Sequence, residues 1–393
     1  MSKRNERQVV LRSIDAWFFR DGQPYNEGES NQTGVESVFP PSPQTVVGAI
    51  RAALARSQGW SGKSRERWNE KLRKTLGDGF EDLGELRFTA PLLARENGLG
   101  NGGLTANPLY PMPLHVVGAF NRNLQDTKLT WTPKQLLAPA QTPLMCDQGN
   151  VCLPATSVLG LKSSEGRWIT KDGLASILAG DPPDYEETVP SESLWKHEHR
   201  VGLARADDTR TAEEGKLYSP VFVRPLRDTA LSVSISGLPT DWHVPELIAL
   251  GGEGRMAECL EVEPFDLPVC PGDSIRSVGG RFLVVLLSPF CLSVTADGVA
   301  KGPSVGDCLP GFDGTRIASG CVGRPIRIGG WNSLENKPIA LRPYLPAGSV
   351  FFCDCDDGAI HSVLTKHGEH IGEMNAYGFG RIAIGAWPRP GGG

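Results

Sequence analysis

The stretch "NAYGFGRIAIGAW" (375–387) places two aromatic residues and one arginine among glycines and then continues as an apolar run typical of a strand. A second stretch, "ALGGEGRMAECLEV" (249–262), follows the same order of glycines, arginine and strand. A segment with helical character precedes each stretch, so Arg255 and Arg381 occupy comparable places. The sequence therefore predicts two units built on one plan, although the two halves share no strong sequence identity.

The segments around these stretches predict a mixed α+β fold. "VVLRSIDAWFF" (9–19) is rich in β-branched and aromatic residues and indicates a first strand. Ser42 is a good N-cap and Pro43 a good first helical residue for the apolar-faced helix that follows. "VPELIALGGEGRMAECLEVE" (244–263) indicates a short helix, a glycine stop and a strand. The segment from about 97 to 195 is rich in Pro, Gly and Asn and is interpreted as insertions.

The first 265 residues thus approximate the order β-α-β-β-α-β of a ferredoxin-like fold. After the connection "EPFDLPVCPGDS" (263–274), the chain repeats a β-rich plan that closes with a helix and a strand. We expect two ferredoxin-like (RRM-like) domains, one over 1–265 with long insertions and one over 266–393 with the glycine-rich loop. A protruding β-hairpin is predicted around 199–226, where two apolar runs flank a charged, turn-rich tip.

Composition bounds the classes of protein that the chain can belong to. A net charge of −5 over 393 residues argues against a general nucleic-acid coat but leaves room for a local RNA site. No apolar run is long enough to span a membrane, and the first twelve residues lack the pattern of a secretory signal. The nine cysteines are scattered without a C-x-x-C pair, as expected for reduced thiols in a cytoplasm.

The residues do not predict an enzyme. His197 and His199 in "HEH" could supply a general base, but no nucleophile motif accompanies them. If 358–371 is a helix, His361 and His370 face opposite sides, so the spacing of a helical metal site is absent. We therefore expect no catalytic residue, no metal and no cofactor.

Two interpretations of the glycine loop at 376–385 stay open. The loop enters a strand rather than a helix and lacks G-K-[ST], so it is neither a dinucleotide-binding fingerprint nor a P-loop. One interpretation is a tight turn beneath a packed strand. In the other, Tyr377 or Phe379 stacks on an unpaired base and Arg381 pairs with phosphate, because these residue types suit single-stranded RNA. The hairpin tip is electrically balanced, which by itself favours a solvated loop.

Six stretches in order carry a resemblance to a known family. They are "SIDAWFFRDGQPYNEGE", "FPPSPQTVVGAIRAAL", "EHRVGLARADDTRTAEEGKLY", "LGGEGRMAE", "YLPAGSVFF" and "NAYGFGRIAIG". Together they resemble the third subunits of type III-B CRISPR (Cmr) RNA-targeting complexes, which are RAMP-superfamily proteins. The resemblance covers residues 9 to 387 and is weakest between 97 and 195.

The resemblance implies a function and a set of partners. The implied fold is a pair of ferredoxin-like RAMP domains with a hairpin thumb. The implied function is non-catalytic: the subunit grips the 5′ tag of a crRNA and caps one end of the backbone filament. The implied partners are the large polymerase-like subunit and the backbone RAMP subunits, with target RNA met only indirectly and no membrane involved.

The resemblance also implies which residues contact RNA. They belong to the first loop, the start of the predicted helix, the hairpin and the two glycine stretches: Arg20, Ser42, Gln44, Thr45, Arg51, His199, Arg200, Arg205, Arg210, Thr211, Lys216, Tyr218, Arg255, Asn375, Tyr377, Gly378, Phe379, Gly380 and Arg381.

Three alternatives remain. A crRNA-processing endoribonuclease of the RAMP superfamily shares the tandem plan and a C-terminal glycine-rich loop. Such enzymes often use a histidine of an early helix, and here no histidine precedes His115. The equivalent subunit of another type III complex would do the same work beside different neighbours. A scaffold without RNA contact is the third.

Overall fold

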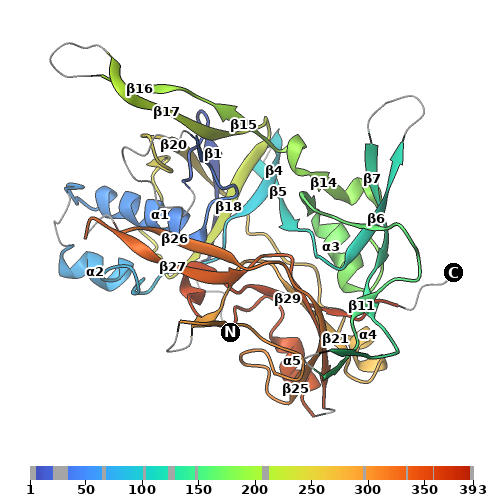
Figure 1. The fold of residues 1–393 in the computed structure, drawn as a ribbon. Coiled ribbons are helices and arrows are strands. Elements are labelled where there is room, and N and C mark those ends of the chain that lie inside the picture. Colours follow the sequence, from blue (N-terminus) through green and yellow to red (C-terminus); the bar gives the residue numbers. More distant parts are fainter. Residues whose placement is uncertain are drawn as a thin grey trace. The chain divides into compact units, whose positions relative to one another are not determined.

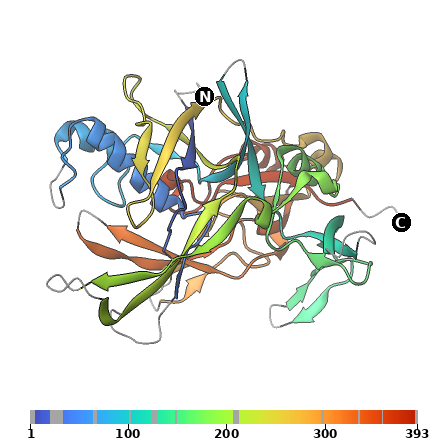
Figure 2. The same ribbon diagram turned by 90° about the horizontal axis from the view of Figure 1, so that it is seen from above.

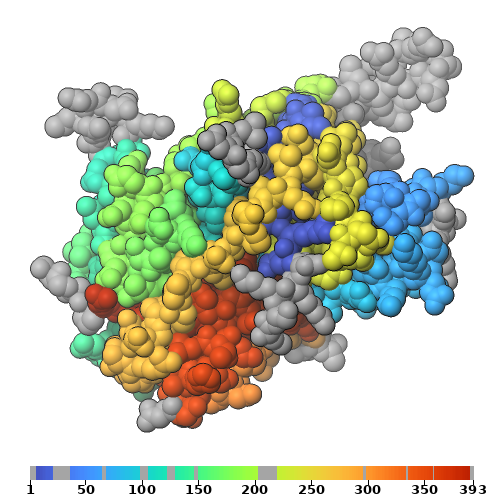
Figure 3. Space-filling view, turned by 180° about the vertical axis from the view of Figure 1, so that it is seen from behind, coloured from blue at the N-terminus to red at the C-terminus, as the bar shows by residue number. Residues whose placement is uncertain are grey.

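A computed structural model describes most of the 393-residue chain (Figures 1 and 2). Figure 3 shows in colour the surface that the described residues contribute to one face. The chain divides into two units. Unit 1 comprises residues 1–106, 192–264 and 328–341, and unit 2 comprises 107–191, 265–327 and 342–393. The described residues are 6–20, 34–63, 68–100, 103–122, 129–146, 149–205, 212–294, 298–332, 335–356 and 358–389.

Unit 1 is organised around an antiparallel sheet with β1 (Arg7–Ser13) at its centre. The strand order is β20-β1-β18-β4, and β19 pairs with the outer side of β20. Val9, Val10 and Leu11 are all fully buried, so both faces of β1 are covered. The strands and helices of this part are β3 (Arg87–Phe88), β4 (Leu92–Gly100), β18 (Thr229–Ser236), β19 (Leu247–Ala249), β20 (Met256–Val262), α1 (Pro43–Ser57) and α2 (Glu70–Leu76).

Unit 1 includes a long hairpin, which lies between β15 and β18 in the chain. Strands β16 (Gly202–Arg205) and β17 (Ala212–Pro225) run side by side in both ribbon views. The base of β17 also pairs with β15 (Trp195–His199) and with β2 (Gly34–Glu36). This pairing fixes which side chains of β15 and β17 share one face of the hairpin base.

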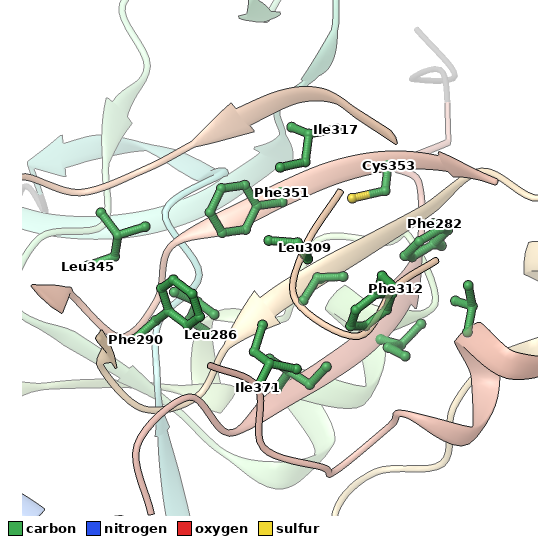
Figure 4. Packing of buried hydrophobic residues seen from close by; sticks show 14 of the residues in the cluster. Phe282, Leu286, Phe290, Leu309, Phe312, Ile317, Leu345, Phe351, Cys353 and Ile371 are labelled. Atoms are coloured by element: carbon green, nitrogen blue, oxygen red, sulfur yellow. The ribbon is translucent and has the colours of Figure 1, made fainter. Parts of the chain in front are cut away.

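Unit 2 repeats the strand order of unit 1. Its sheet runs β29-β21-β28-β25, with every pairing antiparallel. Large apolar residues of all four strands join one core, among them Phe282, Phe351 and Ile317 (Figure 4). The elements are β21 (Phe282–Leu286), β25 (Thr315–Cys321), β28 (Val350–Cys355), β29 (Ile382–Ala386), α4 (Gly272–Ser277) and α5 (Ile360–Thr365).

The remaining strands lie outside these two four-strand arrangements, and β5 and β13 continue the sheet beyond β4. From 103 to 190 they are β5 (Gly103–Pro111), β6 (Val116–Arg122), β7 (Leu129–Leu136), β8 (Ala138–Pro139), β9 (Leu144–Cys146), β10 (Gly149–Val151), β11 (Pro154–Ala155), β12 (Lys162–Ser163), β13 (Arg167–Ile169) and β14 (Thr188–Pro190), with helix α3 (Lys171–Leu178). Further on are β22 (Phe290–Cys291), β23 (Ser293–Val294), β24 (Ala300–Lys301), β26 (Ile326–Asn332) and β27 (Lys337–Leu345).

Several predicted elements need correction. The helix expected near 244–250 is wrong: Leu247–Ala249 forms strand β19, because the run before the glycines is too short for a stable helix. The strand expected over 9–19 ends at Ser13. The helix expected over 358–371 is only α5 (Ile360–Thr365). In the described part of the chain, no helix is long and apolar enough to cross a membrane.

The mixed, strand-rich fold agrees with the α+β expectation at that level. The division into units differs in detail from the expected division at residue 265. Unit 1 ends at Pro264 in that region, but residues 107–191 cluster with the C-terminal part and residues 328–341 with the N-terminal part. The domain limits of 1–265 and 266–393 stay a prediction.

Candidate functional site

Three arginines of unit 1 converge on one carboxylate, that of Asp15. One carboxylate oxygen, Oδ2, accepts hydrogen bonds from Arg200 Nη2 and from Arg255 Nη1, both at 2.9 Å. The other, Oδ1, accepts one from Arg224 Nη2 at 2.8 Å. Asp15 follows β1, Arg200 follows β15, Arg224 lies on β17 and Arg255 precedes β20. The site therefore joins four segments that are far apart in the sequence.

A second carboxylate, Glu198, joins two of these arginines. Arg200 Nε donates to Glu198 Oε1 at 2.7 Å, and Arg224 Nε donates to Glu198 Oε2. Three guanidinium groups against two carboxylates leave the cluster with a net charge of +1. We call Asp15, Glu198, Arg200, Arg224 and Arg255 the arginine cluster.

An aromatic ring supports the arginine cluster from below. Phe222 is only 3% exposed, and its ring centre lies 4.6 Å from the guanidinium carbon of Arg200 and 4.7 Å from that of Arg255. Phe18 packs against the same ring with the centroids 5.2 Å apart. A guanidinium over an aromatic face is held by cation–π attraction, which restricts the positions that it can take.

The arginine cluster stays ionised at neutral pH. Hydrogen bonding from Arg200 lowers the pKa of Asp15 to about 2, and hydrogen bonding from Arg224 lowers the pKa of Glu198. The same bonds raise the pKa of Arg200, mainly through Asp15, and that of Arg224, mainly through Glu198. The arginine side chains remain 23% to 43% exposed, so an anion in solution can reach them.

Of the RNA contacts expected at the start of α1, two side chains are half-buried and two are buried. Ser42 and Thr45 are half-buried, and their hydroxyl oxygens lie 3.0 Å apart. Gln44 is 8% exposed. The RNA contact expected for Arg51 is not supported, because this side chain is 7% exposed and donates to the backbone oxygens of residues 76, 79 and 82. Those bonds tie the helix to the segment that follows α2.

The glycine loop near the C-terminus is a packed turn. Tyr377 and Phe379 are 3% and 0% exposed, so neither can stack on a base as expected. Phe379 instead stacks on Tyr344 at 4.7 Å. A Cβ atom on Gly380 would lie 2.0 Å from the backbone oxygen of Ile371. The geometry therefore supports the tight-turn interpretation and not the RNA-facing one.

The other residues of this loop differ in how far they are buried. Gly378 is buried and has a positive φ of 92°, and its carbonyl oxygen accepts a hydrogen bond from Ser288 at 2.8 Å. Arg381 is half-buried beside His370, and the pKa of that histidine is lowered mainly by burial and also by the charge of Arg381. Asn375 is exposed. Of the two interpretations that the sequence left open, these placements agree with the tight turn beneath a packed strand.

The remaining expected RNA contacts lie on the loop after β1 and on the hairpin. His199 and Arg20 are exposed, and Arg20 pairs with Ser37 in an isolated bridge. Arg205, Lys216 and Tyr218 lie on β16 and β17, where only the backbone is described. Arg210 and Thr211 lie outside the described residues.

Arg200 and Arg255 were predicted RNA contacts, whereas their partners Asp15, Glu198, Arg224 and Phe222 were not predicted. A signal was present in the spacing of the hairpin base. Residues two apart on a strand share a face, so Glu198 and Arg200 lie beside Phe222 and Arg224 once β15 pairs with β17. Asp15 has no such signal, because it lies in the irregular segment after β1. Within the described residues, no group of three or more His, Cys, Asp or Glu could hold a metal ion.

Comparison with protein families decides the assignment. The family model described as "CRISPR-associated protein (Cas_Cmr3)" matches residues 9–387. The chain belongs to this family. The match confirms the resemblance seen in the six stretches, and with it a crRNA-binding subunit of a type III CRISPR effector complex. A search of the curated proteins finds no match.

A search of solved structures finds matches at low identity. A chain of the "Type III-B Cmr-beta bound to cognate target RNA and AMPPnP" is 14% identical, with 88% of this chain and 86% of that chain covered and a TM-score of 0.45. A chain of the "Csm3-Csm4 subcomplex in the type III-A CRISPR-Cas interference complex" is 12% identical, with 88% and 92% covered and a TM-score of 0.37. Because both scores are below 0.5, the assignment rests on the family model.

Proposed function

We propose that the chain grips the repeat-derived 5′ tag of a crRNA in a type III-B complex and caps one end of its backbone filament. The observation that carries the proposal is the arginine cluster, which presents three ionised and partly exposed guanidinium groups with a net charge of +1. Arginine forks match the geometry of phosphate oxygens, and charge-assisted bonds of this kind are among the stronger protein hydrogen bonds.

The strand order supports the finer assignment of the fold. We propose that both units are ferredoxin-like RAMP domains, because each sheet places the first strand between the fourth and the third. A ferredoxin-like fold has one helix after its first strand and one after its third. Unit 1 has the first of these helices, α1, and unit 2 has the second, α5. The hairpin β16–β17 is proposed as the thumb that lies at the junction of tag and guide.

The proposed RNA contacts are revised by the geometry. Arg200 and Arg255 stay central, and Arg224 joins them. The start of α1 with Ser42 and Thr45, the exposed Arg20 and His199, and the hairpin residues remain proposed contacts. Arg51, Tyr377, Gly378, Phe379 and Gly380 are assigned to the fold instead, because their side chains or backbones are packed inside their own units.

We further propose that the chain is non-catalytic, acts in the cytoplasm and binds the large polymerase-like subunit and the backbone RAMP subunits. Purified protein incubated with labelled repeat RNA should leave the RNA intact. Specific cleavage that disappears in His199→Ala would support the endoribonuclease alternative.

The direct test measures binding of the full-length protein to a synthetic RNA of the 5′ tag. Arg255→Ala should weaken binding by about 1–3 kcal/mol if Arg255 makes a charge-assisted phosphate bond. The slope of log affinity against log salt should also decrease by about one unit. Arg276→Ala on α4 is the control, because Arg276 is 51% exposed and pairs only with Asp273 in the described residues. Equal affinities for the wild-type protein and Arg255→Ala would contradict the proposal.

A further inference from the structure

Asp15 has an unusual place for an acidic residue in a site proposed for a polyanion. Its carboxylate touches all three arginines of the arginine cluster, whereas Glu198 touches two. We propose that Asp15 is a positioning residue, which holds Arg200, Arg224 and Arg255 as one binding site for a single RNA phosphodiester. This inference rests on the proposed function and adds the chemical class of the group bound.

The hydrogen-bond pattern leaves donors for that phosphodiester. Each guanidinium group gives one terminal nitrogen to Asp15, which is Nη2 in Arg200 and Arg224 and Nη1 in Arg255. Among the described residues, the other terminal nitrogen of each arginine donates no hydrogen bond. Arg255 Nε is not one of these donors, because it is buried and cannot be reached from solution. A phosphate group with two unesterified oxygens can accept several of these bonds at once.

The charge of the cluster matches the charge of the ligand. Three guanidinium groups and two carboxylates leave one positive charge, and a phosphodiester carries one negative charge. Because the pKa of Asp15 is near 2, this balance holds throughout the neutral range. A cluster without Asp15 would carry two positive charges and have no common acceptor.

The arginines need such an acceptor to stay close together. Like charges repel, and three guanidinium groups come from three different segments of the chain. The Phe222 ring restrains Arg200 and Arg255, but within the described part of the chain it makes no cation–π contact with Arg224. Asp15 is the group that connects Arg224 to Arg255, since Glu198 has no bond to Arg255. Preorganised donors bind an anion more tightly than donors that must first be gathered.

Asp15→Asn tests this inference because positioning and simple electrostatics give opposite signs. The amide keeps the shape but loses the charge and turns one acceptor into a donor. If Asp15 only repelled RNA, its neutralisation would strengthen binding to the 5′-tag RNA. Positioning instead predicts that Asp15→Asn binds the RNA about tenfold more weakly, the loss of one charge-assisted contact.

A matched control separates this effect from the general loss of a carboxylate. Glu96 in unit 1 accepts two hydrogen bonds from Arg12 at 2.7 and 2.9 Å and does not belong to the arginine cluster. Glu96→Gln should therefore leave the RNA affinity of the folded protein within about twofold, and Asp15→Glu should recover part of the affinity that Asp15→Asn loses. Thermal unfolding of each variant corrects the affinities for the folded fraction.

A scan of the RNA identifies the phosphodiester itself. A neutral methylphosphonate placed at each linkage in turn should weaken binding to the wild-type protein at one position most strongly. In Asp15→Asn the penalty at that position should largely disappear. An undiminished penalty, or an affinity for Asp15→Asn equal to or above wild type, overturns the positioning role. If Arg255→Ala and every methylphosphonate leave binding unchanged, the proposed function itself fails, so the two failures are distinguishable.

Discussion

Arg255 and Arg381 follow similar glycine turns and precede the fourth strand of their sheets, but their surroundings are opposite. Arg255 lies above Phe222, bonded to Asp15, with its side chain 23% exposed. Arg381 lies beside His370 in unit 2, and it influences the pKa of the buried Tyr110 and of His367. The same sequence pattern therefore serves a surface cluster in one unit and a packed interior in the other.

The glycines show the physical origin of the difference. Gly254 and Gly380 have similar backbone angles, with φ of 64° and 70°. A Cβ on Gly254 would meet no atom within 4 Å, whereas a Cβ on Gly380 would lie 2.0 Å from the Ile371 oxygen. Gly254 is needed only because the backbone there has a positive φ. Gly380 has a positive φ as well, and its missing side chain also lets two backbone segments approach closely. A glycine–arginine pattern thus specifies a turn and not what the turn faces.

The largest expected effect is that of Gly380→Ala on stability. The added methyl group meets a backbone oxygen that no rotamer change can move, and alanine is also strained at this φ. We expect a loss of about 3–5 kcal/mol in the free energy of unfolding. Urea denaturation of the purified protein measures it.

Gly254→Ala is the matched control, because it has the same backbone strain without the collision. It should cost about 1–2 kcal/mol. The RNA-facing interpretation of the 376–381 loop gives a different ranking, in which folded Gly380→Ala protein loses RNA affinity. If Gly380→Ala unfolds like wild type but binds the 5′-tag RNA weakly, the packed-turn assignment is wrong.

The second expected effect is a loss of stability in acid, which should come from buried histidines of unit 2 and not from the arginine cluster of unit 1. The pKa of His115 is about 3 and that of His370 about 4, both lowered mainly by burial from the ordinary 6.5. Because the unfolded chain binds these protons first, the stability contribution is complete above pH 6.5 and is lost as the pH falls towards the folded values. For the fully buried His115, the loss from pH 7.5 to pH 5 is about 2 kcal/mol.

The arginine cluster should not respond over that range, since Asp15 has a pKa of about 2 and the pKa of Glu198 is lowered. Urea denaturation at pH 7.5 and pH 5 measures the effect, and His115→Leu should reduce the difference between the two. His361→Leu is the control, because His361 is exposed. A pH dependence that is the same in His115→Leu and wild type would assign the acid response to other groups.

The sequence predicted the turns and central strands better than the short helices. β1, β21 and β29 contain β-branched and apolar runs whose burial requires a sheet, so their existence followed from local pattern. The helix expected before Gly251 failed because pairing with β20 turns three residues into β19. The clustering of residues 107–191 with unit 2 depends on contacts distant in sequence, and no local pattern reports those.

The candidate site was predictable only in part for a similar reason. Arg200 and Arg255 were named through the family resemblance, whereas the partners that hold them depend on strand register. Glu198 and Phe222 become neighbours only after β15 pairs with β17. The error at Tyr377 and Phe379 has another cause: aromatic residues beside glycines suit either RNA stacking or core packing, and burial decides between the two.

The smallest expected effect comes from exchanging arginine for lysine in both turns. Lysine keeps the charge but lacks the planar fork, so Arg255→Lys should lose part of the contact with Asp15 and with the Phe222 face. We expect the affinity for the 5′-tag RNA to fall by about 1 kcal/mol, less than for Arg255→Ala. Arg381→Lys should leave the RNA affinity of the folded protein unchanged, because the turn before Arg381 is packed inside unit 2.

Binding measured at two salt concentrations distinguishes an effect of charge from an effect of geometry. If Arg255→Lys binds as tightly as wild type at both, charge alone accounts for the cluster, and the geometry around Arg255 has no role in recognition. If Arg381→Lys weakens binding as much as Arg255→Lys, both turns face RNA and the contrast between them is false.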